Sequence, residues 1–153
     1  METMWIDRLV LGENGWVWQP QQETFDLQKD FSIDEENING EICRMGQLLV
    51  RYGSVAAEQE ANLKRKEEYA KLVYAQVSGA NRSNFEKEGV KVTDSKLSET
   101  VIQSDEYQRA LANLHVLRAD AVKSEHWWRS IIKKAELLNA LAFRQNAEIR
   151  KMG

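Results

Sequence analysis

A heptad repeat of apolar side chains, running from Ile38 to Val77, constrains the fold of this chain more than any other feature. Ten of its twelve positions are apolar or aromatic, which predicts one helix of about 45 residues, or two helices with a bend near Gly53. A helix of that length exceeds what a small globule needs, so the repeat favours a helical hairpin or an oligomer. The twelve positions are Ile38, Ile42, Met45, Leu49, Tyr52, Ala56, Gln59, Leu63, Lys66, Ala70, Val73 and Val77.

Short polar signals mark the two ends of this predicted helix. Ser32 followed by Glu35 fits a capping box at a helix start, and Asp34 is a competing cap. Gly79 supplies a residue that adopts the left-handed conformation in which many helices end. We therefore expect the helix to end at Gly79 and a polar, mobile connection to span residues 80–92.

A second helical stripe follows this connection. Thr93, Asp94 or Ser95 supplies a cap for its start, and Ser104–Asp105 indicates either a bend or a fresh start. Small residues alternate with large ones along the stripe, which suits close packing of helices. Its positions are Tyr107, Ala110, Leu114, Leu117, Ala121, Ser124, Trp128, Ile131, Ala135, Leu138, Ala142, Gln145 and Ile149.

The N-terminal residues follow a different pattern. Asn14-Gly15 separates two runs of aromatic and β-branched residues and is a strong signal for a hairpin turn. Trp16 and Trp18 would share one face of a strand, and a hairpin this short is stable only if that face packs on the helical body or on a neighbouring subunit. Pro20 and the Gln-rich stretch after it indicate a linker.

Charge divides the chain near the same place. Residues 1–36 carry nine acidic side chains and two basic ones, whereas residues 37–153 carry 19 basic and 15 acidic side chains. We therefore divide the chain into an acidic, Trp-containing arm (residues 1–30) and a mildly basic helical domain (residues 31–153). The basic excess permits a polyanionic partner without requiring one. The predicted fold class is all-α, a long antiparallel helical hairpin or bundle that assembles into an oligomer, with a short β-hairpin or irregular arm.

The sequence lacks the features of membrane-spanning and secreted proteins. No apolar run approaches the roughly 20 residues that a membrane-spanning helix needs. The N-terminus has no basic start followed by an apolar core, so no signal peptide is predicted. The lone Cys43 cannot form an internal disulfide, which favours a reducing, cytosolic setting.

No constellation of residues typical of catalysis is found. The chain has no glycine-rich phosphate cradle that ends in Lys and Ser or Thr. Cys43, His115 and His126 do not have the spacing of metal ligands. Most carboxylates lie within helical charge patterns, such as Glu60 with Lys64 and Glu125 with Arg129, which are typical of solvated helix faces. We therefore predict a protein that is not an enzyme and that needs neither a cofactor nor a metal.

A basic run near the end of the first helix is the most informative polar feature. Binding of a single strand without sequence preference requires cations along the phosphate backbone and aromatic rings on which bases stack. Tyr69, Tyr74 and Phe85 supply such rings. An ordinary solvated helix face is an equal alternative. The candidate DNA-binding residues are Lys64, Arg65, Lys66, Lys71, Arg82, Lys87, Lys91 and Lys96.

Adjacent tryptophans in the second stripe indicate a subunit contact. Trp127 and Trp128 are about 100° apart on a helix, so both cannot occupy the centre of one interface. Trp128 is on the stripe and is expected in the core, whereas Trp127 is expected to reach a second interface. The candidate oligomer-interface residues are Trp127, Trp128, Ile131 and Leu138.

The order of these features resembles phage recombination mediator proteins of the UvsY type. The resemblance covers residues 31–151, from FSIDEEN through LKRKEEYAKLVYAQVSG and KVTDSKLSETV to WWRSIIKKAELLNAL. It implies a ring-shaped homo-oligomer that binds single-stranded DNA in the cytoplasm of the infected bacterial host. There it would help to load a RecA-like recombinase onto DNA covered by single-strand binding protein. The arm has no counterpart in this family, and the basic excess of the body is small.

Two further functions compete with this expectation. The first is a helical adaptor or scaffolding protein whose long helices only assemble and bind no nucleic acid. The second is a regulator whose acidic arm imitates DNA, in which case deletion of residues 1–30 would abolish its activity. Binding of DNA that weakens with salt distinguishes the mediator from the adaptor.

Overall fold

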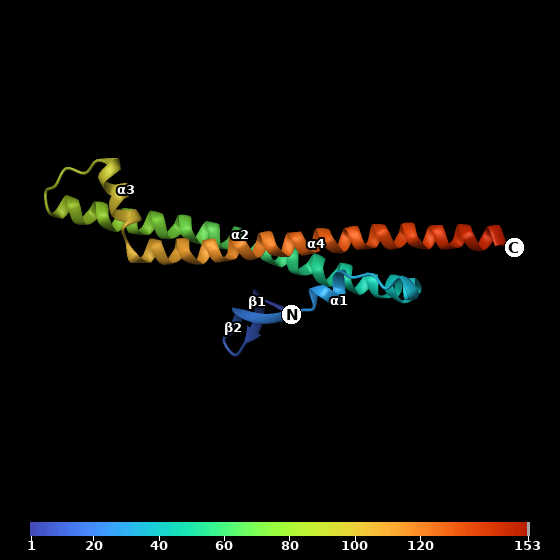
Figure 1. Cartoon of the computed structure of the whole chain (residues 1–153). Coiled ribbons are helices and arrows are strands. Elements are labelled where there is room, and N and C mark those ends of the chain that lie inside the picture. The colour runs from blue at the N-terminus through green and yellow to red at the C-terminus, as the bar shows by residue number, and fades with distance from the viewer. Residues whose placement is uncertain (153) are drawn as a thin grey trace. The chain divides into compact units, whose positions relative to one another are not determined.

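The computed structural model describes residues 1–152, as a β-hairpin followed by helices (Figure 1). This arrangement confirms the predicted helical fold with an N-terminal hairpin. None of the helices within residues 1–152 is both long and apolar enough to cross a membrane. The elements are β1 (Glu2–Gly12), β2 (Gly15–Phe25), α1 (Leu27–Phe31), a 3₁₀ turn (Glu35–Asn37), α2 (Ile38–Lys87), α3 (Asp94–Ile102) and α4 (Asp105–Met152).

The hairpin is longer than the sequence predicted. Strands β1 and β2 pair antiparallel from Glu2 opposite Phe25 to Gly12 opposite Gly15. Gly15 has a φ of +110°, a conformation that favours glycine, which explains the turn signal. Pro20 lies within β2 and not in a linker. A proline is tolerated on an edge strand at a position whose backbone nitrogen faces away from the partner strand.

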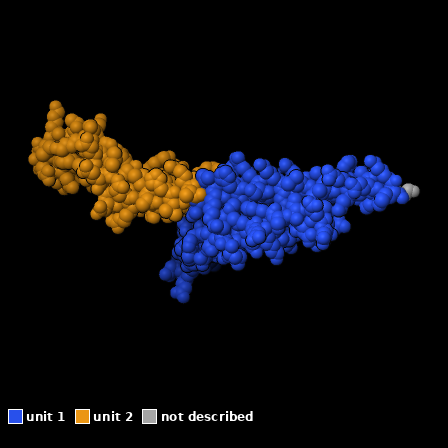
Figure 2. Space-filling view, in the orientation of Figure 1, with its two compact units in different colours: residues 1–59, 120–153 blue, residues 60–119 orange. Residues whose placement is uncertain are grey.

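The chain forms two compact units, to each of which α2 and α4 contribute (Figure 2). Unit 1 comprises residues 1–59 and the described part of the chain from Asp120 onward, and unit 2 comprises residues 60–119. Within unit 1, Tyr52 contacts Trp127 and Glu41 pairs with Lys134. Positions earlier in α2 therefore meet later positions in α4, and the two helices are antiparallel in this unit, as predicted.

The core of unit 1 joins the hairpin to both long helices. Phe25 is fully buried, and its ring centroid lies 5.3 Å from that of Tyr52 and 5.0 Å from that of Trp127. Met4 and Ile6 of β1 are buried in the same cluster. The inner face of the hairpin therefore contributes to this core. On the opposite face Trp16 and Trp18 are 66% and 49% exposed and are not core residues. Packing of this face on a neighbouring subunit stays a prediction.

Unit 2 has a smaller core between the same two helices. Tyr74 packs edge to face on Tyr107, with ring centroids 5.4 Å apart, and Glu67 pairs with Arg118. The helices are therefore antiparallel in this unit too. Short α3 closes the unit through its buried Val101. The remaining core residues are Ala70, Val73, Val77, Ala110 and Leu114.

Side-chain caps explain where α3 and α4 begin. Thr93 Oγ1 accepts a hydrogen bond from the Lys96 amide, as predicted for the start of α3. Ser104 Oγ accepts one from the Tyr107 amide, so Ser104 marks a fresh start and not a bend. At α2 the predicted capping box is absent. Instead, Asn37 Oδ1 accepts a hydrogen bond from the Gly40 amide, which places the helix start at Ile38.

Helix α2 continues past Gly79, where the sequence predicted its end, and stops at Lys87. Gly89 has the left-handed φ of +67°. The amide of Val90 donates to the Phe85 carbonyl and that of Gly89 to the Glu86 carbonyl. These two bonds form a Schellman motif, which satisfies the last carbonyls of the helix. The connection is consequently short, from Glu88 to Thr93, and Arg82 and Lys87 lie on the helix.

The predicted core position of Trp128 is taken by Trp127 instead. Trp127 is buried in the core of unit 1, whereas Trp128 is half-buried. Trp128 lies close to Gly53, so that a Cβ added at position 53 would be 3.2 Å from the indole ring. Gly53 therefore causes no break in α2, because its lack of a side chain makes room for an indole.

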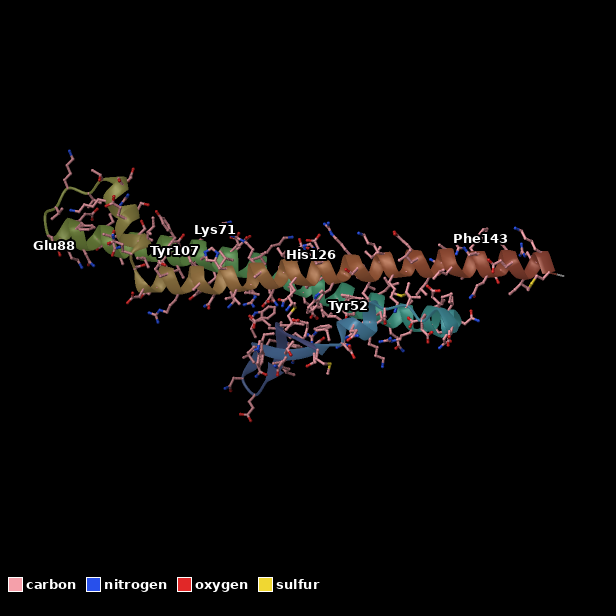
Figure 3. All side chains as sticks on the ribbon, in the orientation of Figure 1. Tyr52, Lys71, Glu88, Tyr107, His126 and Phe143 are labelled. Atoms are coloured by element: carbon pink, nitrogen blue, oxygen red, sulfur yellow. The ribbon has the colours of Figure 1, made fainter. Side chains whose placement is uncertain are left out.

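The buried Tyr52 hydroxyl gives unit 1 a dependence on alkaline pH. It donates a 2.8 Å hydrogen bond to Asp30 Oδ2, and burial together with this carboxylate raises the pKa of Tyr52 above its usual value of 10.0 (Figure 3). The folded state thus favours neutral tyrosine, so its contribution is complete below pH 10 and is lost as the pH rises further.

We expect the urea midpoint of the wild type to fall more steeply between about pH 9.5 and 11.5 than that of Tyr52→Phe, because the unfolded chain ionises this tyrosine first. Unfolding followed by circular dichroism across this range provides the measurement. Parallel pH profiles for the two proteins would contradict the prediction.

Candidate nucleic-acid interface

Three exposed cations form a row along α2 in unit 2. Lys64, Lys71 and Arg82 are separated by 7 and 11 residues. At 100° per residue all three fall within about 20° of one helix face, and they span about 27 Å along the axis. The row lies on the side of α2 away from Val73 and Val77, which are buried in the core of unit 2. It is therefore open to solvent.

Each cation in this row has an acidic partner. Lys64 lies 2.8 Å from Glu60 and Lys71 lies 2.8 Å from Glu68, and Arg82 lies 3.6 Å from Asp94. The hydrogen bonds that these two lysines donate to Glu60 and Glu68 raise the pKa of Lys64 and the pKa of Lys71. Because the pairs are exposed and screened by salt, a polyanion is able to displace the carboxylates.

A groove with aromatic walls lies beside the row, between α2 and α4 of unit 2. It has a volume of about 410 Å³. Lys71 and Arg118 contribute cations to its lining, while Tyr74 and Tyr107 contribute rings. Lys71 and Tyr107 are labelled in Figure 3. Glu67, the ion-pair partner of Arg118 at 3.3 Å, also lines the groove. The remaining lining residues are Ala70, Leu111 and Leu114.

A second aromatic residue flanks the row near the end of α2. Phe85 follows Tyr74 by 11 residues, so both rings lie on one stripe, about 60–80° round the helix from the cations. Lys96 Nζ of α3 lies 5.1 Å from the centroid of the Phe85 ring, within the range of a cation–π contact. Lys87 is exposed, but it lies about 140° round α2 from Lys64 and is outside the row, and Lys91 is exposed in the connection. Tyr74, Phe85 and Lys96 therefore flank the row, whereas the predicted cations do not all lie on one side of unit 2.

Two cations of the basic run beside Lys64 do not belong to the row either. Arg65 and Lys66 are half-buried and lie about 100° and 200° round α2 from Lys64. Arg65 donates to the buried Asn62 Oδ1 at 3.4 Å. The basic run that looks continuous in the sequence is therefore divided among three faces of the helix. Only Lys64 contributes to the solvent-exposed row.

Sequence reasoning missed Arg118 and gave Tyr107 only a core role. Arg118 follows Tyr107 by 11 residues, a spacing that puts both on one face of α4. The same spacing relates Tyr74 to Phe85 on α2. A search for cations spaced 11 residues from an aromatic ring would have found Arg118.

The predicted oligomer-interface residues lie in unit 1. Trp127, Ile131 and Leu138 are buried in the core of the single chain, where they pack with Phe25 and Tyr52. Trp128 is half-buried against Gly53. These side chains therefore stabilise the folded chain itself, and a subunit contact would need other residues.

No group of three or more His, Cys, Asp and Glu side chains within residues 1–152 is arranged to hold a metal ion. Comparisons with protein-family models, with curated proteins and with solved structures find no match to this chain.

Proposed function

We propose that this chain is a single-stranded-DNA-binding recombination mediator, and that the row of Lys64, Lys71 and Arg82 beside Tyr74 and Phe85 is its binding site. The juxtaposition of exposed cations with half-buried aromatic rings along about 27 Å of helix is the observation that supports this proposal. Residues 60–119 carry ten basic and nine acidic side chains. The local arrangement, and not net charge, therefore provides the attraction.

The proposed mechanism is physical. Lys64, Lys71 and Arg82 exchange their carboxylate partners for backbone phosphates, and counterions released from the DNA favour the exchange. Unstacked bases lie on Tyr74 and Phe85, which is possible only for a single strand. Because one site of this kind is weak, several copies in a homo-oligomeric ring would raise the affinity by multivalency.

In this proposal the ring holds single-stranded DNA for a RecA-like recombinase and assists the displacement of single-strand binding protein. The setting is the cytoplasm of an infected bacterium, and no nucleotide is hydrolysed by this chain. The resemblance of residues 31–151 to UvsY-type mediators supports this part of the proposal.

A helical adaptor that binds no nucleic acid is the second candidate. The observation that favours it is the outer side of the hairpin, where Trp5, Trp16 and Trp18 are about half exposed or more, because exposed apolar patches typically bind proteins. Both candidates include assembly, so DNA binding decides between them.

Two matched variants test the proposed site. The cation variant is Lys64→Gln/Lys71→Gln/Arg82→Gln. The carboxylate variant is Glu60→Gln/Glu68→Gln/Asp94→Asn, which breaks the same three ion pairs but keeps the cations. Fluorescence anisotropy with labelled oligo-dT at about 50 and 200 mM salt measures the affinity. We expect the first variant to bind at least about 10-fold more weakly at low salt, with a slope of log affinity against log salt reduced by about 2, since each lost phosphate contact contributes roughly 0.7.

The carboxylate variant is expected to bind more tightly than the wild type, and a duplex of the same length is expected to bind more weakly than the single strand. Equal affinities of the wild type and the cation variant would show that the row is not the site. Absence of binding by the wild type at low salt would overturn the proposed function and favour the adaptor.

A further inference from the structure

The groove between α2 and α4 of unit 2 has two unlike ends. At one end Arg118 of α4 pairs with Glu67 of α2, with Arg118 Nη2 3.3 Å from Glu67 Oε1. At the other end Tyr74 contacts Tyr107, and their ring centroids are 5.4 Å apart. Glu67 and Tyr74 are seven residues apart, which is about 10 Å along α2. The groove therefore runs from a charged, hydrogen-bonding pair to a pair of aromatic rings.

The floor between these two ends is apolar. Ala70 and Leu114 are buried in the core of unit 2, and the half-buried Leu111 packs against this core. All three side chains line the groove, whose volume of about 410 Å³ is within the range typical of ligand pockets. Such pockets combine apolar and aromatic walls with a few polar groups that fix the orientation of the ligand. The groove therefore has the composition of a site for a flat, partly polar group.

Lys71 connects this groove with the row of cations. It lines the groove between Glu67 and Tyr74, and it is also the middle member of the row. A phosphate bound to Lys71 places its nucleotide at the mouth of the groove. The bases of a single strand are unpaired, so they are able to turn out of the stack and enter a pocket. The group that the groove fits is consequently a base of the bound strand.

The pair of Glu67 and Arg118 restricts which base fits. An ionised carboxylate only accepts hydrogen bonds, and a guanidinium only donates them. A carboxylate has about four lone-pair sites, so Glu67 is able to accept a further hydrogen bond while it stays paired with Arg118. The N4 amino group of cytosine donates to such a carboxylate. Uracil and thymine carry the oxygen O4 in its place, and two acceptors would then face each other.

We propose that the groove of unit 2 holds one base of the bound single strand, and that Glu67 selects a base with an exocyclic amino group, as in cytosine, over one with a carbonyl oxygen in its place. This inference rests on the proposed binding of single-stranded DNA and adds a base preference to it. The row of cations holds the phosphates of any sequence, whereas Glu67 distinguishes the bases. The rings of Tyr74 and Tyr107 provide the aromatic surface against which the base packs.

Oligo-dC and oligo-dU of equal length test this preference, because cytosine and uracil differ only in the group at C4 and in the proton at N3. Fluorescence anisotropy at low salt and at a pH where both bases are uncharged measures the two affinities. We expect the wild type to bind oligo-dC at least about 5-fold more tightly than oligo-dU, which is the lower end of the discrimination that one good base contact provides.

Glu67→Gln and Glu68→Gln are a matched pair of variants. Each removes one negative charge from the same turn of α2 and breaks one ion pair, with Arg118 and with Lys71 respectively. The amide in Glu67→Gln presents either a donor or an acceptor, so the two affinities are expected to agree within about 2-fold. Glu68 is exposed about 100° round α2 from Glu67. Glu68→Gln is therefore expected to bind both oligonucleotides more tightly and to keep their ratio.

The possible outcomes separate this inference from the proposed function. Equal binding of oligo-dC and oligo-dU by the wild type would overturn the inference and leave the row of cations as the site. An unchanged ratio in Glu67→Gln would also overturn it, because the preference would then have another source. Absence of binding to both oligonucleotides would overturn the proposed function, and this inference with it.

Discussion

The Phe25→Ala variant is expected to lose about 3–5 kcal/mol of unfolding free energy, which is typical of truncating a fully buried aromatic ring. Phe25 is fully buried at the end of β2, and its ring contacts Tyr52 of α2 and Trp127 of α4. Arg51 also lies over the ring, with its guanidinium carbon 4.6 Å from the centroid. Removal of the ring thus leaves a cavity where the hairpin meets both helices. Urea unfolding followed by circular dichroism measures the loss.

The same substitution at another phenylalanine of unit 1 is the control. Phe143 is 77% exposed on α4, so Phe143→Ala is expected to change the unfolding free energy by no more than about 0.5 kcal/mol at low protein concentration. Hydrogen exchange should also show faster exchange of the β1 and β2 amides in Phe25→Ala only. A small loss together with normal protection of these strands would mean that Phe25 does not anchor the hairpin.

The periodic parts of the fold were predictable from the sequence. The heptad repeat gave the direction and approximate length of both long helices, and local hydrogen-bonding residues gave the starts of α3 and α4 at Thr93 and Ser104. The end of α2 was predicted ten residues too early, at Gly79 and not Gly89. A single glycine within a helix costs only about 1 kcal/mol, and the left-handed Gly89 with its closing hydrogen bonds ends the helix instead.

The tryptophan assignment failed for a geometric reason. Leu114 is buried in the core of unit 2 and Trp127 in the core of unit 1. These positions are 13 residues apart, which places them about 140° apart round an α-helix. The buried side of α4 is therefore different in the two units, and in unit 1 it includes Trp127, which packs on Phe25 and Tyr52. A stripe fitted over the whole helix could not show this shift.

The sequence predicted where the candidate site lies but not which residues belong to it. Lys64, Lys71 and Arg82 form a row because of helical spacing alone, which a sequence shows once α2 is known to continue past Gly79. The contribution of Arg118 needs the pairing of α2 with α4, a long-range property that local patterns do not contain. Alternation likewise showed that Trp16 and Trp18 share a face, but both faces of the hairpin carry apolar residues, so the covered face was not predictable.

A buried polar cluster provides the second large effect. Asp30 is 3% exposed; its carboxylate accepts hydrogen bonds from Arg44 and from the Tyr52 hydroxyl, and its carbonyl accepts one from Lys134 Nζ at 3.1 Å. Lys134 Nζ also lies 2.5 Å from Glu41 Oε2. These contacts tie α1 to α2 and α4 beside the apolar core of unit 1.

We expect Asp30→Ala to lower the unfolding free energy by about 3 kcal/mol, because it leaves the Arg44 charge and the Tyr52 hydroxyl without their shared acceptor while both stay partly or wholly buried. Tyr52→Phe removes only the hydroxyl and should cost about 1 kcal/mol. In the Asp30→Ala/Tyr52→Phe double variant, the loss caused by Tyr52→Phe should be smaller than in the wild type, because the hydroxyl has already lost its acceptor Asp30. Urea unfolding of all four proteins measures these differences. Additive losses would show that Asp30 and Tyr52 act independently, and a neutral Asp30→Ala would show that the carboxylate does not hold α1 in place.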